Sequence, residues 1–409
     1  MRTRRRTMAY KGLIPGRFPT AELKRSRVLE VSPHITMIEG YISDSFFFKP
    51  PSCNCFVLRD GDLVLLVDTG TYPFYRSTIL DVLDKHRRDG AKRLVLMLTQ
   101  GHFDHVANND VILEAGYGDV RFLLPEVEVP TIDLYHHWMG DFGAMTEYYD
   151  PYREFPMVFP TAAVNVASRI STRFARSLVS RNCRMLFRGI NTLADRAEIL
   201  LLDEREEWRF GDVSFRGWEV GRFLAVHDAT HSPGHLSFYD PEDKVFLSGD
   251  ATLEINPAFF DSSLETCIEM MGLFKRFAEL GYVETATDAH RSSIWAEELA
   301  ISFGYDPIHP VQAVDMARGV EECTSLYAFF EDYYSALKRE VMSALFRLGE
   351  ATVPEMVEEF EASQDPNARF KTLMAFPRLP SRVDVMVANV MKENGIPRRH
   401  EGERIVFCA

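Results

Sequence analysis

The stretch TQGHFDHVANN, residues 99–109, decides the fold. It follows an apolar run, residues 94–98, that predicts a buried strand, and it places two imidazoles and a carboxylate close together as His102, Asp104 and His105. A loop between a strand and a helix can turn these side chains toward one point, where they would suit a cation such as Zn²⁺. Because His and Asp are also common turn and capping residues, the cluster alone leaves a purely structural role open.

Three further candidate ligands strengthen the metal interpretation. Each stands just beyond another short strand-like segment: His231, Asp250 and His290. Side chains at the carboxyl ends of neighbouring strands gather at one edge of an α/β sheet, which is where such sheets bind ligands. Four converging loops therefore favour a metal site.

The remaining pattern predicts an α/β catalytic domain over residues 29–310, after a tail at 1–28. A hairpin turn is expected at residues 60–62 and a helix over 75–89, while residues 206–254 alternate like antiparallel strands. An insertion at about 126–205 looks mainly helical. Residues 311–409 predict a separate helical domain that ends in a short hairpin.

In the order Asp68-Thr69-Gly70, then residues 99–105, then His231, Asp250 and His290, the chain resembles the metallo-β-lactamase-fold hydrolases. This superfamily includes glyoxalase II-type thioesterases, lactonases and β-lactamases. The resemblance covers about residues 29–305 and implies an αββα sandwich. Residues 311–409 likewise resemble the winged-helix appendage of some members.

The resemblance also implies a role for each candidate residue. One metal would be held by His102, His231 and the residue at position 100, and the other by Asp104, His105 and His290. Asp250 would bridge the two ions, and Asp68 would orient the ligand loop from behind.

Two departures from the family pattern stand out. Ala229-Thr230 replaces the usual Pro-Gly before His231, which should alter only the loop. Gln100 replaces a ligand, and its neutral amide oxygen is a harder, weaker donor for zinc than imidazole. The sequence leaves open a two-metal site with a weaker first ion, a site with one ion, and a non-catalytic relative. Zn²⁺ is the expected metal, and Fe or Mn would also suit the harder ligand set.

The neighbouring histidines need separate interpretations. His235 falls on a variable position of the family pattern and is expected to be a strand residue. His227 lies in the strand before His231 and is expected to be structural.

The resemblance implies a hydrolytic mechanism. A metal lowers the pKa of bound water from about 15.7 toward 7, and the resulting hydroxide attacks an ester, thioester or lactone carbonyl. Asp104 or Asp250 would hold and deprotonate that nucleophile. Alternatives are removal of another leaving group, such as a lactam amine or a halide, and a non-catalytic regulator that binds metal or nucleic acid.

The substrate and partners are less sharply indicated. Phe47 and Phe48 lie where this superfamily often has a flap, and they suit an aromatic small molecule, although a packing loop is the alternative. A net charge of -14 argues against nucleic acid as a partner, and the helical C-terminal region suits packing or a homodimer. Scattered cysteines and the lack of a long apolar segment predict a cytoplasmic protein that does not enter a membrane.

Overall fold

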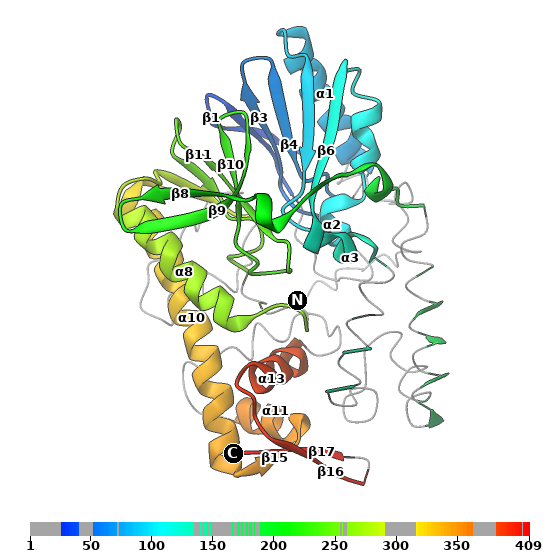
Figure 1. Ribbon diagram of the computed structural model, residues 1–409, viewed down its shortest axis with the longest axis vertical. Coiled ribbons are helices and arrows are strands. Elements are labelled where there is room, and N and C mark those ends of the chain that lie inside the picture. Colours follow the sequence, from blue (N-terminus) through cyan, green and yellow to red (C-terminus); the bar gives the residue numbers. More distant parts are fainter. Residues whose placement is uncertain are drawn as a thin grey trace, which may run out of the picture.

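Two seven-stranded sheets lie face to face in the upper half of the molecule as drawn in Figure 1. The computed structural model describes residues 26–40, 52–71, 73–134, 189–253, 260–290, 316–362, 382–402 and 404–409, together with Asn256 and scattered residues between 140 and 184. Within this part of the chain, no helix has the length and apolar character needed to cross a bilayer.

The first sheet has the strand order β1-β2-β3-β4-β5-β6-β7. The pairs from β1 to β4 are antiparallel and those from β4 to β7 are parallel. The predicted turn at residues 60–62 joins β3 to β4, and its Gly61 has a φ of 57°, a left-handed conformation that suits glycine. The strands are β1 (Val28–Ser32), β2 (Ile35–Ile38), β3 (Cys55–Asp60), β4 (Leu63–Val67), β5 (Arg93–Met97), β6 (Asp119–Pro125) and β7 (Glu198–Leu200).

The second sheet has the order β14-β13-β12-β11-β10-β9-β8. Its pairs are antiparallel, except that β12 and β13 run parallel. The strands are β8 (Glu206–Phe210), β9 (Val213–Val220), β10 (Phe223–His227), β11 (Leu236–Asp240), β12 (Val245–Leu247), β13 (Thr285–Thr287) and β14 (Met316–Arg318).

Side chains along the central strands point alternately to the two faces of their sheet, so each sheet packs against the other sheet on one face and against helices on the other. In β4, Leu65 and Val67 face the second sheet, whereas Val64 and Leu66 face α1 (Pro73–Arg88) on the outer side. The outer face of the second sheet is covered by α8 (Leu264–Glu279) and α10 (Gly319–Leu348) (Figure 1). The predicted αββα sandwich is therefore confirmed.

The C-terminal region is joined to the sandwich through α10. This 30-residue helix packs along α8 and continues to a small unit at the far end of the molecule (Figure 1). The unit contains the sheet β15-β17-β16 and two helices packed on it. Its elements are β15 (Glu350–Ala351), α11 (Val353–Ala362), α13 (Arg382–Glu393), β16 (Arg398–Glu401) and β17 (Arg404–Cys408).

Short helical segments complete the described structure. They are α2 (Phe103–Val106), α3 (Val129–Ile132), and the 3-10 turns η1 (Asn109–Leu113), η2 (Glu126–Glu128), η3 (Ala194–Arg196) and η4 (Leu202–Glu204).

The two sheets include strands from segments predicted to lie outside them, namely the insertion at 126–205 and the domain after residue 310. Strand β7, within the supposed helical insertion, pairs with β6 and closes the first sheet. Strand β14 lies beyond residue 310, yet it pairs with β13 in the second sheet. Each has only three residues, too few for a periodic sequence signal, and both are held by pairing with distant strands.

Candidate metal centre

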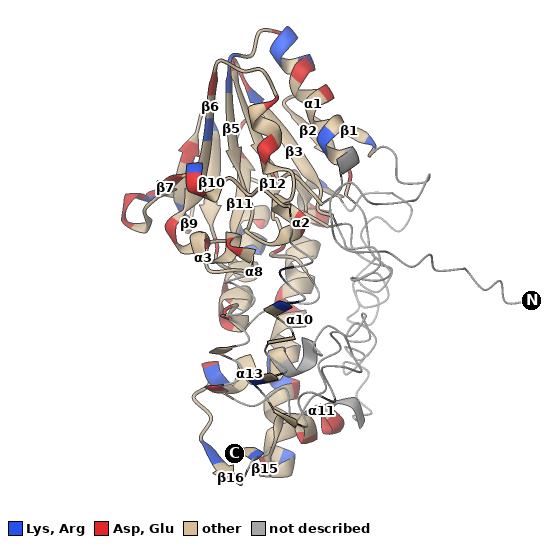
Figure 2. Ribbon diagram, turned by 90° about the vertical axis from the view of Figure 1, so that its right-hand side faces the viewer, with Lys and Arg blue, Asp and Glu red and all other residues tan. Residues whose placement is uncertain are grey.

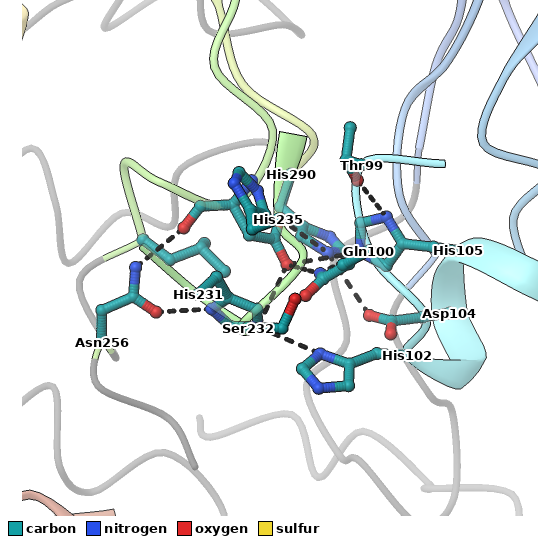
Figure 3. A network of polar contacts seen from close by, with 12 residues as sticks. Thr99, Gln100, His102, Asp104, His105, His231, Ser232, His235, Asn256 and His290 are labelled. Atoms are coloured by element: carbon teal, nitrogen blue, oxygen red, sulfur yellow. Dashed lines mark hydrogen bonds and ion pairs between the residues drawn. The ribbon is translucent and has the colours of Figure 1, made fainter. Parts of the chain in front are cut away.

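The predicted ligands meet at one edge of the sandwich. They lie on loops that follow β5, β10, β12 and β13, and Figure 3 shows their side chains pointing toward a common centre. Figure 3 labels Gln100, His102, Asp104, His105, His231 and His290 of this group. The group also includes Asp250, whose carboxylate oxygens lie 3.3, 3.6 and 3.5 Å from His105, His231 and His290. The other two predicted site residues, Phe47 and Phe48, lie outside the described residues.

Asp68 lies behind His105 and fixes its ring. One carboxylate oxygen of Asp68 accepts a hydrogen bond from the Thr99 amide at 2.8 Å, and the other accepts one from the Thr99 hydroxyl at 2.7 Å. That second oxygen also lies 2.9 Å from His105 Nδ1. Both residues are fully buried. Because Nδ1 faces Asp68, the Nε2 atom of His105 points to the centre of the site.

Asp250 lies in the middle of the cluster. Its Oδ2 is 3.3 Å from His105 Nε2 and 3.6 Å from His231 Nε2, while its Oδ1 is 3.5 Å from His290 Nε2. On the His105 side, His290 Nε2 also lies 3.3 Å from Asp104 Oδ2. One ligand atom from each of Asp104, His105 and His290 can be chosen so that all lie within 4.8 Å of one another.

On the other side of Asp250, His102 and His231 form a second pair. His102 Nδ1 lies 3.1 Å from His231 Nε2, and both imidazoles are buried. The Nδ1 atom of His231 lies 2.5 Å from Asn256 Oδ1. Since an amide oxygen can only accept, His231 carries its proton on Nδ1 and turns an unprotonated Nε2 toward the centre.

Gln100 lies between these two groups and is 1% exposed. Its Nε2 donates to Asp250 Oδ2 and lies 2.7 Å from His105 Nε2. Its Oε1 is buried and makes no hydrogen bond to any described residue. Rotating the amide by half a turn exchanges the two atoms and would place Oε1 against the carboxylate, an arrangement that needs a cation between two acceptors.

The electrostatics of the cluster suit a cation. Burial alone would raise the pKa of Asp250, but His290, His105 and His231 outweigh it and lower that pKa well below its usual range. Burial opposes a proton on His290, yet Asp250 and Asp104 raise its pKa. Burial lowers the pKa of His231 to about 4, so this ring is neutral at pH 7. Buried imidazoles, carboxylates and an amide oxygen without a donor form a ligand set that fits a divalent metal.

Comparison with known proteins gives the same assignment. Residues 49–303 match the model of the metallo-beta-lactamase superfamily.

The chain belongs to the metallo-β-lactamase superfamily. Its family and fold identify it as a hydrolase, as predicted.

Three relatives show how distant the similarity is. The probable metallo-hydrolase YflN of Bacillus subtilis (strain 168) is 19% identical over 268 residues, which cover 61% of this chain and 83% of YflN. A beta-lactamase domain protein from Burkholderia ambifaria is 16% identical and aligns over 93% of both chains, with a TM-score of 0.52. The sec-alkylsulfatase Pisa1 from Pseudomonas sp. is 12% identical with a TM-score of 0.49, and the match covers 90% of this chain but 50% of Pisa1.

His235 supports this metallo-β-lactamase site without pointing into it. Its Nδ1 lies 2.6 Å from Asp228 Oδ1, and its Nε2 accepts a hydrogen bond from the Asp250 amide at 2.9 Å. Both ring nitrogens are thus engaged by the protein, which supports a structural role, although His235 lies one residue before β11 and not within a strand as predicted. His227 similarly bonds the carbonyl of Pro233 at 2.8 Å, on the supporting side of the loop.

Several residues of the metallo-β-lactamase site have no signal in the sequence. Asn256 bonds His231 through Oδ1 and donates from Nδ2 to the Asp250 carbonyl at 2.8 Å. The hydroxyl of Tyr334 on α10 lies 2.8 Å from the carbonyls of Ala251 and Leu253. Glu128 contacts the loops on both sides of the site. A single amide, phenol or carboxylate in an irregular segment has no spacing that could reveal such a contact.

Proposed function

We propose that this chain is a metal-dependent hydrolase of small carbonyl compounds, namely esters, thioesters or lactones. One observation carries the proposal: Asp250 lies between two groups of buried ligands, with Oδ2 3.6 Å from His231 Nε2 and Oδ1 3.5 Å from His290 Nε2. A carboxylate in that position suits the bridge of a two-metal site.

In this proposal each group of side chains holds one ion. Gln100, His102 and His231 would hold the first ion, and Asp104, His105 and His290 the second. Zn²⁺ suits the imidazole nitrogens, and the oxygen donors would also accept Fe or Mn. The half-turn of the Gln100 amide described above would present its Oε1 to the first ion.

The chemistry divides between the ion and the protein. A bound ion acts as a Lewis acid that polarises the substrate carbonyl and makes water acidic enough to ionise near neutral pH. Asp104 or Asp250 would take up the proton that the attacking water gives up. Asp68 and Asn256 keep the ring nitrogens of His105 and His231 directed at the centre, so the ligands need little rearrangement before reaction.

Other functions remain as alternatives to be tested. The same residues could release another leaving group, such as a lactam amine or a halide. A non-catalytic regulator that binds nucleic acid is less well supported, because residues 385–391 of α13 are all buried and offer no face to a DNA groove. Figure 2 also shows basic and acidic residues interspersed over the described C-terminal unit. We propose a cytoplasmic enzyme, with the C-terminal unit used for packing or for a homodimer.

The proposal is tested by metal analysis of protein purified without chelators, together with a panel of acyl-CoA, S-acyl-glutathione, lactone and haloaromatic substrates. We expect stoichiometric metal and hydrolysis of at least one carbonyl substrate. His105→Ala should lose the ion that His105 holds and, with it, hydrolysis. His86→Ala, on α1 away from the site, serves as the matched control. Turnover of a haloaromatic alone would favour the alternative leaving group, and retarded duplex DNA without hydrolysis would favour the regulator.

A further inference from the structure

We infer that Glu128 is a positioning residue that holds the loop bearing His102 and the loop bearing His231 at a fixed separation. The inference rests on the proposed function for its consequence, but its geometry stands on contacts that do not involve a metal. Glu128 is 1% exposed and lies in η2, immediately after β6 of the first sheet.

The two oxygens of Glu128 are divided between the two halves of the sandwich. Oε1 accepts a hydrogen bond at 2.5 Å from the amide of Gly101, which directly precedes His102 in the first half. Oε2 accepts one at 2.8 Å from the hydroxyl of Ser232, which directly follows His231 in the second half, and another at 2.9 Å from the amide of Gly234. One carboxylate thus connects the two loops that supply the His102–His231 pair.

Glycine allows both loops to approach this closely. A methyl group added at Gly234 would lie 2.5 Å from Glu128 Cβ and 2.6 Å from its Oε2. One added at Gly101 would lie 2.5 Å from the amide nitrogen of Ile132, in the helix that follows Glu128. These separations are too short for a side-chain carbon, so both loops pack directly against the Glu128 segment.

The carboxylate of Glu128 can accept hydrogen bonds from both loops, whereas the amide of a glutamine cannot accept all of them. Each bonded partner of Glu128 is a donor, and two of the three are backbone N–H groups that cannot become acceptors. A glutamine would keep one oxygen for one loop and turn an NH₂ group toward the N–H of the other. Burial raises the pKa of Glu128 to about 7, while its hydrogen bonds from the Gly101 amide and the Ser232 hydroxyl act in the opposite direction because they stabilise the ionised carboxylate.

The consequence falls on the first metal subsite. His102 and His231 are its two imidazoles, and their facing nitrogens are 3.1 Å apart. The third ligand at this subsite is the weaker donor Gln100, so binding depends more heavily on the alignment of the two rings. The second subsite draws on Asp104, His105 and His290, which Glu128 does not contact directly in the described structure.

The test compares Glu128→Gln and Ser232→Ala with the control Glu126→Gln. Glu126 is an exposed carboxylate two residues away, and it accepts the amide of Leu202 instead of a site loop. Co²⁺ is titrated into each metal-free protein against a competing chelator, well below the unfolding temperature. We expect Glu128→Gln to lower the affinity for the more weakly held Co²⁺ ion by about tenfold or more and to alter the Co²⁺ spectrum. The affinity for the more tightly held ion should not change. Ser232→Ala should give a smaller loss, and Glu126→Gln none.

Hydrogen exchange of the metal-free proteins decides the geometric part independently. Peptides covering residues 100–106 and 229–236 should exchange faster in Glu128→Gln than in Glu126→Gln. The inference is overturned if Glu128→Gln and Glu126→Gln exchange at the same rate in both loops. It is also overturned if wild type binds two Co²⁺ ions and Glu128→Gln binds both of them with wild-type affinity. If wild-type protein binds no Co²⁺, the proposed function fails, while the exchange rates still decide whether Glu128 holds the loops.

Discussion

Asp68→Asn tests whether a residue that touches no proposed substrate controls the metal site. The substitution keeps the shape of the side chain and suits the backbone, because Asp68 has a φ of 60° and asparagine tolerates this left-handed conformation. Its oxygen can still accept from the Thr99 amide. The new NH₂ group, however, faces His105 Nδ1 and the Thr99 hydroxyl, where the carboxylate now lies 2.9 and 2.7 Å away.

The expected magnitude follows from the protonation of His105. An NH₂ group cannot accept the Nδ1 proton, so the ring is driven to carry its proton on Nε2, the atom that faces the metal site. Loss of such an orienting carboxylate typically costs about 10–100-fold in metal affinity, or about 1.4–2.7 kcal/mol. Because both partners are fully buried, water cannot replace the lost acceptor.

Chelator competition at pH 7.5 measures this effect, with Asp62→Asn as the control. Asp62 is an exposed carboxylate that pairs with Arg93 at 2.8 Å on the rim of the first sheet. We expect one ion to be weakened in Asp68→Asn and neither in Asp62→Asn. Wild-type affinity for both ions in Asp68→Asn would refute the orienting role of this carboxylate.

Three further predictions concern the ligands and their supports. Gln100→His should bind the first ion more tightly, and an unchanged chelator titration would show that the amide does not occupy a ligand's place. Metal binding at pH 7 should release protons and weaken as the pH falls, because the pKa of His290 is raised in the metal-free protein. Calorimetry in two buffers of different ionisation enthalpy measures the number of protons released, and no release would contradict the raised pKa of His290. Tyr334→Phe should cost about 1–3 kcal/mol in urea unfolding and also weaken metal binding. Tyr117→Phe, which removes a 2.8 Å bond to the Leu83 carbonyl, should cost stability alone, and equal metal affinities in the two variants would contradict a role for α10 at the site.

Local sequence signals predict the fold and the metal-site loops well. The strands on either side of the site are runs of apolar residues, and the polar residues that end them fall at one edge because the strands share a sheet. The position of His105 in front of Asp68 follows from the neighbouring parallel strands β4 and β5. These features depend on short segments whose pattern is visible in the chain itself.

Residues that support the site from a distance could not be predicted in this way. Glu128 and Asn256 lie in irregular segments, and their partners are fixed only after both sheets have packed. Tyr334 reaches the loop after β12 from a helix more than 80 residues away in sequence. Strands β7 and β14 are equally non-local, since each is stabilised by a partner strand and not by its own three residues.

The central claim is that the buried cluster around Asp250 holds catalytic metal. Its most direct test is the metal content per chain of wild type, Gln100→His and His105→Ala, purified side by side without chelators and assayed for hydrolysis. We expect about two ions in active wild type, two ions in Gln100→His with the first held more tightly, and loss of the second ion and of activity in His105→Ala. One ion in wild type would refute Gln100 as a working ligand. Protein without stoichiometric metal, whose hydrolysis survives His105→Ala, would contradict the claim itself.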